Sequence, residues 1–405
     1  MCVLTVVVFG LMLTGCPQPT EEVQLPPDAA AEAQLAAEAQ ATPDVTPPEG
    51  EPYKIGAIFA TTGPAAALGQ PEADTAEMIE EMTNAAGGIN GRPVEIIIRD
   101  TKGEETEALA AIKELIEKEG VLAIVGPTRS GTTLGIIDAI EKAEVPLVSC
   151  AAAVKITTPV KKWVFKTPQT DAHAVEAIYG YLNDKGISKI AVISASTGYG
   201  VAGLEQLKLQ AEAAGIEIVD AEEFQDTDTD MTAQLTRIKN GDAEGVICWG
   251  IGPAPSLVTK QMAQIQLDIP IFQSHGVANK RFIEGAGDAA EGVILPAGKL
   301  LVVDQLPDSD PQKATLAAYK KAYEEKFNKD VDTFGGHCWD ALQMVINGIR
   351  EGGDDPAAIR DTIESTTGFV GTGGVFNYSA DDHYGLTADA FVMIKIVDGE
   401  WQLAD

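Results

Sequence analysis

The chain has 405 residues and a formal net charge of -32 at pH 7. A negative charge of this size repels nucleic acid and anionic lipid headgroups, so neither is an expected partner. The length exceeds what one hydrophobic core usually supports, which predicts two lobes.

The first sixteen residues predict export and a lipid anchor. An apolar run from Val3 to Leu13 ends in Leu13-Thr14-Gly15-Cys16. It is shorter than the roughly 20 apolar residues that span a bilayer. Its ending resembles a bacterial lipobox, which implies cleavage before Cys16 and acylation of the thiol. We expect residues 1–16 to be a lipoprotein signal segment and Cys16 to tether the protein in the bacterial envelope, in the periplasm or at the outer face of the cytoplasmic membrane. A buried N-terminal strand is the alternative.

The next segment, residues 17–52, is predicted to be a disordered acidic spacer. Positions 17–51 contain no aromatic residue, no Lys and no Arg, and are rich in Ala, Pro, Glu and Gln. Such a stretch cannot bury enough apolar area to offset the entropy lost on ordering. The composition changes at Tyr53, where we expect the folded body to begin.

Short apolar runs then alternate with helical patterns, and this alternation occurs twice. The first set predicts strands at 53–60, 94–100, 121–126, 145–149 and 163–166, with helices at 71–86, 104–119 and 131–143. The second set predicts strands at 189–195, 217–224, 245–250, 269–273 and 292–296, with helices at 171–185, 201–214, 231–240 and 255–265. This βαβ order, with strands that are apolar throughout, indicates two parallel sheets covered by helices on both faces.

The C-terminal part predicts a return to the first lobe. Helices are expected at 311–327, 337–351 and 356–365, followed by strands at 373–378 and 390–397. Helices without intervening strands most simply cover the first lobe. The chain would then cross between the two lobes three times, near 165–170, 295–298 and 376–382. The predicted fold is therefore α/β, with two doubly wound parallel-sheet lobes joined by a three-strand hinge. Lobe 1 comprises 53–167 plus 297–375, and lobe 2 comprises 168–296 plus 376–405.

Motifs for catalysis and cofactors are weak. The G-x-G-x-x-G run from Gly198 to Gly203 follows a strand and opens a helix, as in dinucleotide sites, but Tyr199 would crowd a pyrophosphate. A P-loop-like run from Gly126 has Thr132 where the phosphate-binding Lys belongs. The four histidines lie in separate segments, and the body's cysteines have no metal-binding spacing. We therefore expect no enzyme activity, no cofactor and no metal.

Several runs carry a resemblance to a known family. They are Ile55-Gly56-Ala57-Ile58, Thr62-Gly63-Pro64, Asn84 to Glu95 with its Gly-Gly-Ile-Asn-Gly-Arg-Pro-Val core, Ala123 to Pro127, and Ala289 to Val293. The chain from Tyr53 onward resembles the leucine–isoleucine–valine binding proteins of ABC importers. The resemblance implies a type I periplasmic-binding fold and a monomer. It also implies that a small ligand is trapped between lobes and delivered to a membrane permease.

The resemblance also implies a set of ligand-binding residues. Ser130 matches the serine that contacts the ligand carboxylate, although it could simply cap a helix. Ala152 and Ala153 match positions that offer backbone groups, and Ala153 lacks the hydroxyl usual there. Leu68, Tyr199 and Gly252 fall at the expected cavity walls, with a surface tyrosine as the alternative for Tyr199.

His275 is the most informative departure from the family. Amino-acid-binding members usually carry an acidic residue there, which pairs with the ligand ammonium. A cationic imidazole repels an ammonium, and a neutral one accepts weakly. We therefore expect a small organic carboxylate, more readily an aromatic or keto acid than an amino acid. A loop histidine outside the pocket is the alternative for His275. For the whole protein, a ligand-sensing module of the same fold is the alternative to a transporter subunit, and an exported enzyme is a third.

Overall fold

The computed structural model describes residues 46–404. The predicted signal segment, the anchor residue Cys16, spacer positions 17–45 and the last residue lie outside the described residues. Positions 46–52 form no helix or strand but are joined to the folded body. The N–H of Glu49 donates to the carbonyl of Gly91, and Arg92 Nε donates to the carbonyl of Glu51, each at 2.9 Å. Within 46–404, no helix is both long and apolar enough to cross a membrane.

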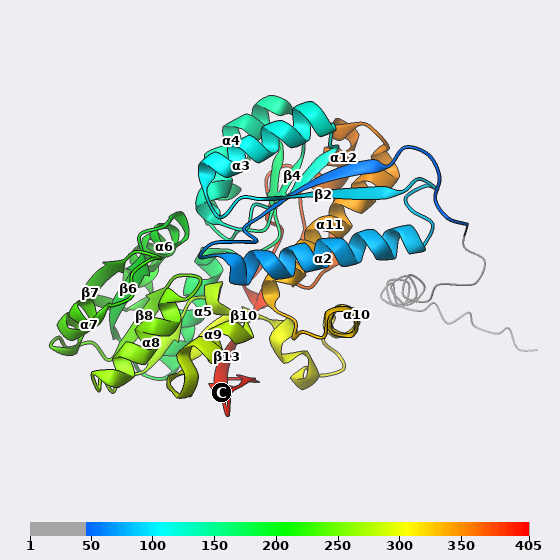
Figure 1. The fold of residues 1–405 in the computed structure, drawn as a ribbon. Helices are drawn as coiled ribbons and strands as arrows, with labels where there is room; N and C mark the ends of the chain where they lie inside the picture. Colours follow the sequence, from blue (N-terminus) through cyan, green and yellow to red (C-terminus); the bar gives the residue numbers. More distant parts are fainter. Residues whose placement is uncertain (1–45, 405) are drawn as a thin grey trace, which may run out of the picture.

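The first sheet has the strand order β2-β1-β3-β4-β5, and all its pairs are parallel. Its strands are β1 (Tyr53–Phe59), β2 (Val94–Asp100), β3 (Ala123–Val125), β4 (Leu147–Ser149) and β5 (Val164–Lys166). Ile55 and Phe59 of β1 pack with α2 (Ala66–Ala85) and α11 (Thr333–Gly352). Ile58 faces the other way and packs with α3 (Glu105–Glu114) and α4 (Ser130–Ala143). The strand is therefore apolar on both faces because helices cover both (Figure 1).

The second sheet has the order β14-β13-β10-β9-β8-β6-β7. Its strands are β6 (Lys189–Ala195), β7 (Glu217–Phe224), β8 (Gly245–Trp249), β9 (Ile271–Gln273), β10 (Ile294–Gly298), β13 (Phe391–Val397) and β14 (Glu400–Leu403). One face is covered by α5 (Asp171–Asp184) and α6 (Gly198–Ala214), the other by α7 (Thr232–Lys239) and α8 (Ala254–Gln264). The pairs from β6 to β10 are parallel, as predicted, whereas β13 runs antiparallel to both β10 and β14.

The C-terminal helices return to the first sheet, as the sequence predicts. α11 packs against α2 and against α12 (Pro356–Glu364), and α10 (Lys313–Phe327) lies beside α2 (Figure 1). A small antiparallel pair, β11 (Thr367–Val370) with β12 (Val375–Asn377), precedes the final crossing to β13. The helix α9 (Lys280–Ala286) and the strands β11 and β14 were not predicted. The helix expected over 104–119 is α-helical only to Glu114 and then continues as a π-helical turn over Leu115–Glu119.

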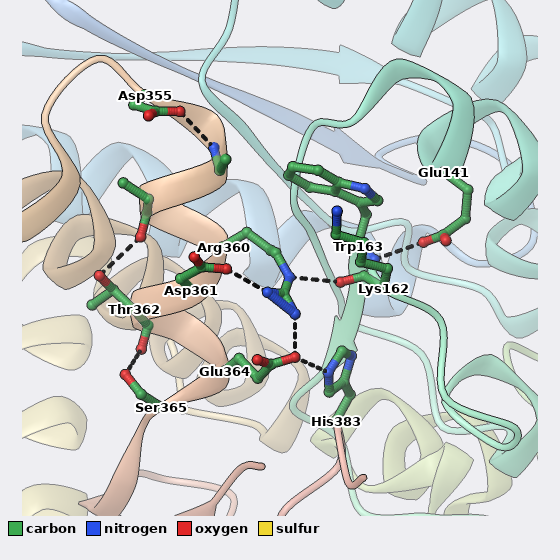
Figure 2. Close-up of polar contacts among 12 residues, drawn as sticks. Glu141, Lys162, Trp163, Asp355, Arg360, Asp361, Thr362, Glu364, Ser365 and His383 are labelled. Atoms are coloured by element: carbon green, nitrogen blue, oxygen red, sulfur yellow. Dashed lines mark hydrogen bonds and ion pairs between the residues drawn. The ribbon is translucent and has the colours of Figure 1, made fainter. Parts of the chain in front are cut away.

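The crossing segments are bound to one another. The carbonyl of His383, in the last crossing, accepts from the N–H of Lys166 at 3.2 Å, and the hydroxyl of Tyr378 donates to the Lys166 carbonyl at 2.9 Å. His383 also lies 2.9 Å from the Val164 carbonyl through Nδ1 and 3.1 Å from the Glu364 carboxylate through Nε2. Figure 2 shows that Glu364 also contacts Arg360, whose Nε donates to the Lys162 carbonyl at 3.0 Å. These bonds hold α12 and the last crossing against β5.

Candidate ligand-binding site

A cavity lies between the two sheets, where their strands end. Its empty space, counted together with the open solvent at the mouth, is about 380 Å³. The first sheet contributes the loops after β3 and β4, and the second contributes those after β6, β8 and β9. The position follows the general rule that ligands bind at the carboxyl ends of parallel strands. The lining residues are Leu68, Thr128, Arg129, Ser130, Cys150, Ala151, Ala152, Pro168, Tyr199, Ile251, His275, Gly276, Phe334 and His337.

Ser130 is the first residue of α4, and Arg129 occupies the capping position before it. Its side chain is 2% exposed, and its Oγ accepts the N–H of Ala153 at 3.2 Å. A serine hydroxyl that accepts one bond can still donate its proton. The N-terminus of α4 adds free backbone N–H groups and a positive dipole end, which favour an anion. This part of the cavity can bind a carboxylate.

The opposite wall is aromatic. Tyr199, in the first turn of α6, lies with its hydroxyl 3.3 Å from Nδ1 of His275. The rings of Trp249 and Phe391 meet the His275 ring edge-on at centroid distances of 5.9 and 5.3 Å. These neighbours fix the orientation of the imidazole. The position of Tyr199 excludes the alternative of a surface tyrosine, because only 5% of the residue is exposed.

The imidazole of His275 is neutral. Burial lowers its pKa to about 3, and the nearby His337 and Lys166 contribute in the same direction. Its Nε2 is buried and has no hydrogen-bond partner among the described residues. His275 lines the cavity and keeps one ring nitrogen without a partner, so the alternative of a loop histidine outside the pocket does not hold.

The structure places only some of the residues predicted from the sequence at the cavity. Leu68, Ser130, Ala152, Tyr199 and His275 all line the cavity, whereas Ala153 and Gly252 are not among the lining residues. The N–H of Ala153, expected to face a ligand, is donated to Ser130 instead. Gly252 has a φ of +70°, and a Cβ at this position would collide with the carbonyl of Pro64. Gly252 therefore allows two loops to approach each other closely.

Nine further residues at the cavity were not predicted, among them Arg129, Phe334 and His337. His337 lies in α11 with 4% of the residue exposed, and burial lowers its pKa to about 3. Its Nδ1 is also without a partner in the described part of the chain. Phe334 and His337 are one helical turn apart, which the sequence indicates, but nothing in the sequence says that this turn of α11 reaches the cavity.

Contacts at the cavity mouth join loops of the two sheets. Arg129, after β3, forms a 2.5 Å salt bridge with Asp226, after β7, and both side chains are largely buried. Gly131 of α4 and Gly198 of α6 approach so closely that a Cβ on Gly198 would lie 2.7 Å from the Gly131 Cα. Lys155 pairs with Glu205 of α6 at 2.5 Å. The two halves therefore enclose the cavity between them.

Two buried titratable residues, Lys166 and Asp171, lie next to the cavity. Lys166, at the end of β5, donates to the carbonyl of Ala152 at 2.6 Å and interacts with Asp171 at the start of α5. Burial lowers the pKa of Lys166 to about 7 and raises that of Asp171 to about 7. Both oxygens of Asp171 lack a hydrogen-bond partner among residues 46–404.

The glycines of the G-x-G-x-x-G run have a packing role. A Cβ on Gly203 would enter the Trp249 ring, and one on Gly200 would collide with the backbone of Ala195. These two glycines let α6 approach β6 and β8, and Tyr199, directly before Gly200, lines the cavity. The pattern therefore reflects close helix–sheet packing.

Two helix-covered sheets that enclose a small cavity between their strand ends define a two-lobed binding protein of the type I periplasmic-binding fold. The chain belongs to the periplasmic binding protein family, whose model matches residues 52–399. This is a family of binding and transport proteins, not a family of enzymes. The match confirms the predicted fold and the predicted resemblance.

Individual relatives support the same assignment. The chain is 27% identical over 325 residues to a leucine-, isoleucine-, valine-, threonine- and alanine-binding protein of Pseudomonas aeruginosa, covering 80% of this chain and 84% of that one. It is similar to the crystal structure of an extracellular ligand-binding receptor from Rhodopseudomonas palustris HaA2, with a TM-score of 0.83, 28% identity, and coverage of 88% of this chain and all of that one. It is also similar to the branched-chain amino acid transporter substrate-binding protein of Streptococcus pneumoniae solved with isoleucine, with a TM-score of 0.79, 27% identity, and coverage of 88% and 99%.

Proposed function

We propose that this protein is the lipid-anchored, extracytoplasmic solute-binding subunit of an ABC importer. It captures a small organic carboxylate between two lobes and delivers it to the membrane permease. The family match and the name of the Pseudomonas relative support the binding role, and the name of the Streptococcus relative supports transport. Both relatives are named for amino acids, so the chemistry of this cavity must decide whether the ligand here carries an ammonium group.

The residues that line the cavity argue against an ammonium group on the ligand. The residues that line the cavity include a serine at a helix N-terminus, an arginine and two histidines, but no Asp or Glu. An ammonium buried here would have no carboxylate partner in the lining, and an unpaired buried charge is costly. Two buried carboxylates lie near the lining without belonging to it. Glu72, whose pKa is raised by burial, accepts from the hydroxyl of Thr128, and burial raises the pKa of Asp171 to about 7. We infer that the ligand is a keto or aromatic acid.

Calorimetric titration with matched ligand pairs tests this proposal. The pairs are phenylpyruvate against phenylalanine, and 4-methyl-2-oxopentanoate against leucine. Each pair shares its side chain and its carboxylate and differs only in the group on the second carbon. We expect the keto acid to bind at least about tenfold more tightly in one pair, which is the scale of one lost buried hydrogen bond. Tighter binding of the amino acid in both pairs would refute the proposal.

His275→Glu provides the matching protein change. A carboxylate at this position can pair with an ammonium and repels a keto oxygen, so the preference should move toward the amino acid by about tenfold or more. His173→Glu is the control, because His173 contacts Tyr384 outside the cavity lining. If both variants shift the ratio equally, His275 does not contact the ligand.

The anchor is a separate part of the proposal and rests on the Leu13-Thr14-Gly15-Cys16 sequence. Expression in a bacterial host fed an alkyne fatty acid should label the wild-type protein. Cys16→Ser should abolish labelling because the acylated thiol is gone. Cys2→Ser, a change in the same leader, should leave labelling intact. Labelling that persists in Cys16→Ser would contradict the anchor at this residue.

A further inference from the structure

Two buried imidazole nitrogens at the cavity have no partner. Nε2 of His275 and Nδ1 of His337 are each enclosed, and neither forms a hydrogen bond within residues 46–404. The two residues come from distant segments, the short turn η3 (His275–Val277) after β9 and the helix α11. Both line the same cavity, and only 6% and 4% of the two residues are exposed. Buried polar atoms are rarely left unpaired in folded proteins, so two at one cavity indicate a ligand group that satisfies them.

The surroundings of His275 indicate which chemistry it offers. The Tyr199 hydroxyl is 3.3 Å from Nδ1. When this hydroxyl donates to Nδ1, the ring proton resides on Nε2, which is then a buried donor without a partner on a residue that lines the cavity. The partner it requires is an acceptor, such as an oxygen. An ammonium has no lone pair and cannot fill this role.

His337 adds a second imidazole to the lining from a different element, α11. Its ring is uncharged at neutral pH, so it carries one N–H and one bare nitrogen. The ring of Phe334, one turn earlier on α11, meets it edge-on at 6.4 Å. A carbonyl oxygen has two lone pairs and can accept from two donors at once. A pair of imidazoles around one small cavity therefore matches a single carbonyl oxygen.

We propose that His337 is a specificity-determining residue, and that His275 and His337 together bind a ligand oxygen distinct from the carboxylate held at Ser130. This inference rests on the proposed function and narrows it to 2-oxo acids. A 2-oxo group is adjacent to the carboxylate, so one small ligand can reach Ser130 and both imidazoles. An acid without the oxo group leaves both ring nitrogens unpaired.

The test compares three acids with one carbon skeleton by calorimetry: 4-methyl-2-oxopentanoate, 2-hydroxy-4-methylpentanoate and 4-methylpentanoate. The wild-type protein should bind the oxo acid at least about tenfold more tightly than the acid without a 2-substituent, with the hydroxy acid between them. His337→Phe should remove most of this preference by weakening the oxo acid, while binding of the unsubstituted acid changes less than about threefold. His337→Asn, which keeps a short donor and acceptor, should retain part of the preference.

Two controls make the result decisive. His173→Phe applies the same substitution outside the cavity lining and should change neither affinity. If circular dichroism shows that His337→Phe is unfolded, the Asn variant and the wild-type ligand series still test the inference. Equal binding of the oxo and unsubstituted acids, or equal weakening of both by His337→Phe, would overturn the inference even if acids still bind better than amino acids. Tighter binding of leucine, or binding of none of the acids, would overturn the proposed function as well.

Discussion

Buried titratable groups at the cavity set the expected pH dependence of binding. Burial lowers the pKa values of His275 and His337 to about 3. Both rings are therefore neutral throughout the range from about pH 5.5 to about pH 8, although a free imidazole titrates near 6.5 in that range. Burial moves the pKa values of the neighbouring Lys166 and Asp171 to about 7, so both residues titrate inside this range. The charge next to the cavity should thus become more negative as the pH rises through about 7.

We predict that the dissociation constant of 4-methyl-2-oxopentanoate rises as the pH increases through about 7 and is constant below about pH 6, as measured by titration calorimetry in buffers of equal ionic strength. The sequence had left open a protonated His275 that binds acids better at mildly acidic pH, and the burial of the ring argues against it. Affinity that continues to rise as the pH falls below about 6 would show that the imidazole is protonated in the complex.

Sequence reasoning found some residues at the cavity and missed others for a physical reason. Ser130, Tyr199 and His275 follow parallel strands, and such loops meet at one edge of a sheet, so their convergence was predictable. His337 lies inside a long helix that is buried all round, where periodicity does not distinguish a cavity-facing turn from a core-facing one. The N–H of Ala153 was expected to bind the ligand, but it donates to Ser130 instead. This bond joins two loops, so neither segment of the sequence indicates it alone.

At the scale of elements, α4 and α6 meet end to end through glycines. A side chain on Gly198 would press against the backbone of Gly131, so the two helices can touch only if this position has no Cβ. If the protein works by closing its lobes around the ligand, this contact forms on closure. Gly198→Leu should hold the mouth open and weaken ligand binding by about tenfold or more, because the contacts of the second lobe with the ligand are lost.

Small-angle scattering provides the direct readout of that prediction. The radius of gyration of the wild type should fall when 4-methyl-2-oxopentanoate is added, while that of Gly198→Leu should change less. Gly180→Leu is the matched control, since a Cβ at this exposed position in α5 meets no neighbour within 4 Å, and it should behave as the wild type does. Full compaction of Gly198→Leu with unchanged affinity would show that this contact does not limit closure.

Most elements could be predicted because their signals are local. Strands such as β2, β6 and β7 begin and end at the predicted residues, since each is a short apolar or alternating run between turn residues. The missed β14 did have a signal. Asp398 and Gly399 both have positive φ and connect β13 to β14, as expected for an Asp-Gly two-residue hairpin. The four-residue β11 has no comparable signal, because Gly368 interrupts it and its partner β12 is only three residues long.

At the scale of the whole molecule, three segments connect the two sheets, and the first and last of them are hydrogen bonded to each other. Gln169 in the first crossing donates to the carbonyl of Gly373 at 2.7 Å. The N–H of Thr170 donates to the hydroxyl oxygen of Tyr384 at 3.0 Å. Few-residue connections of this kind can absorb the dihedral changes of a hinge while the lobes stay rigid. The division into lobes that move as units, with the boundaries given above, stays a prediction.

The central claim is that a carboxylate without an ammonium group occupies the cavity between the two sheets. Identification of the ligand that accompanies the protein from its own host tests this claim most directly. The protein is purified without denaturant, its mass is measured under native conditions, and the ligand is released and analysed by mass spectrometry with and without an amine-reactive label. The account predicts one small acid per chain that the label does not modify. A stoichiometric α-amino acid, or a ligand without a carboxylate, would contradict it.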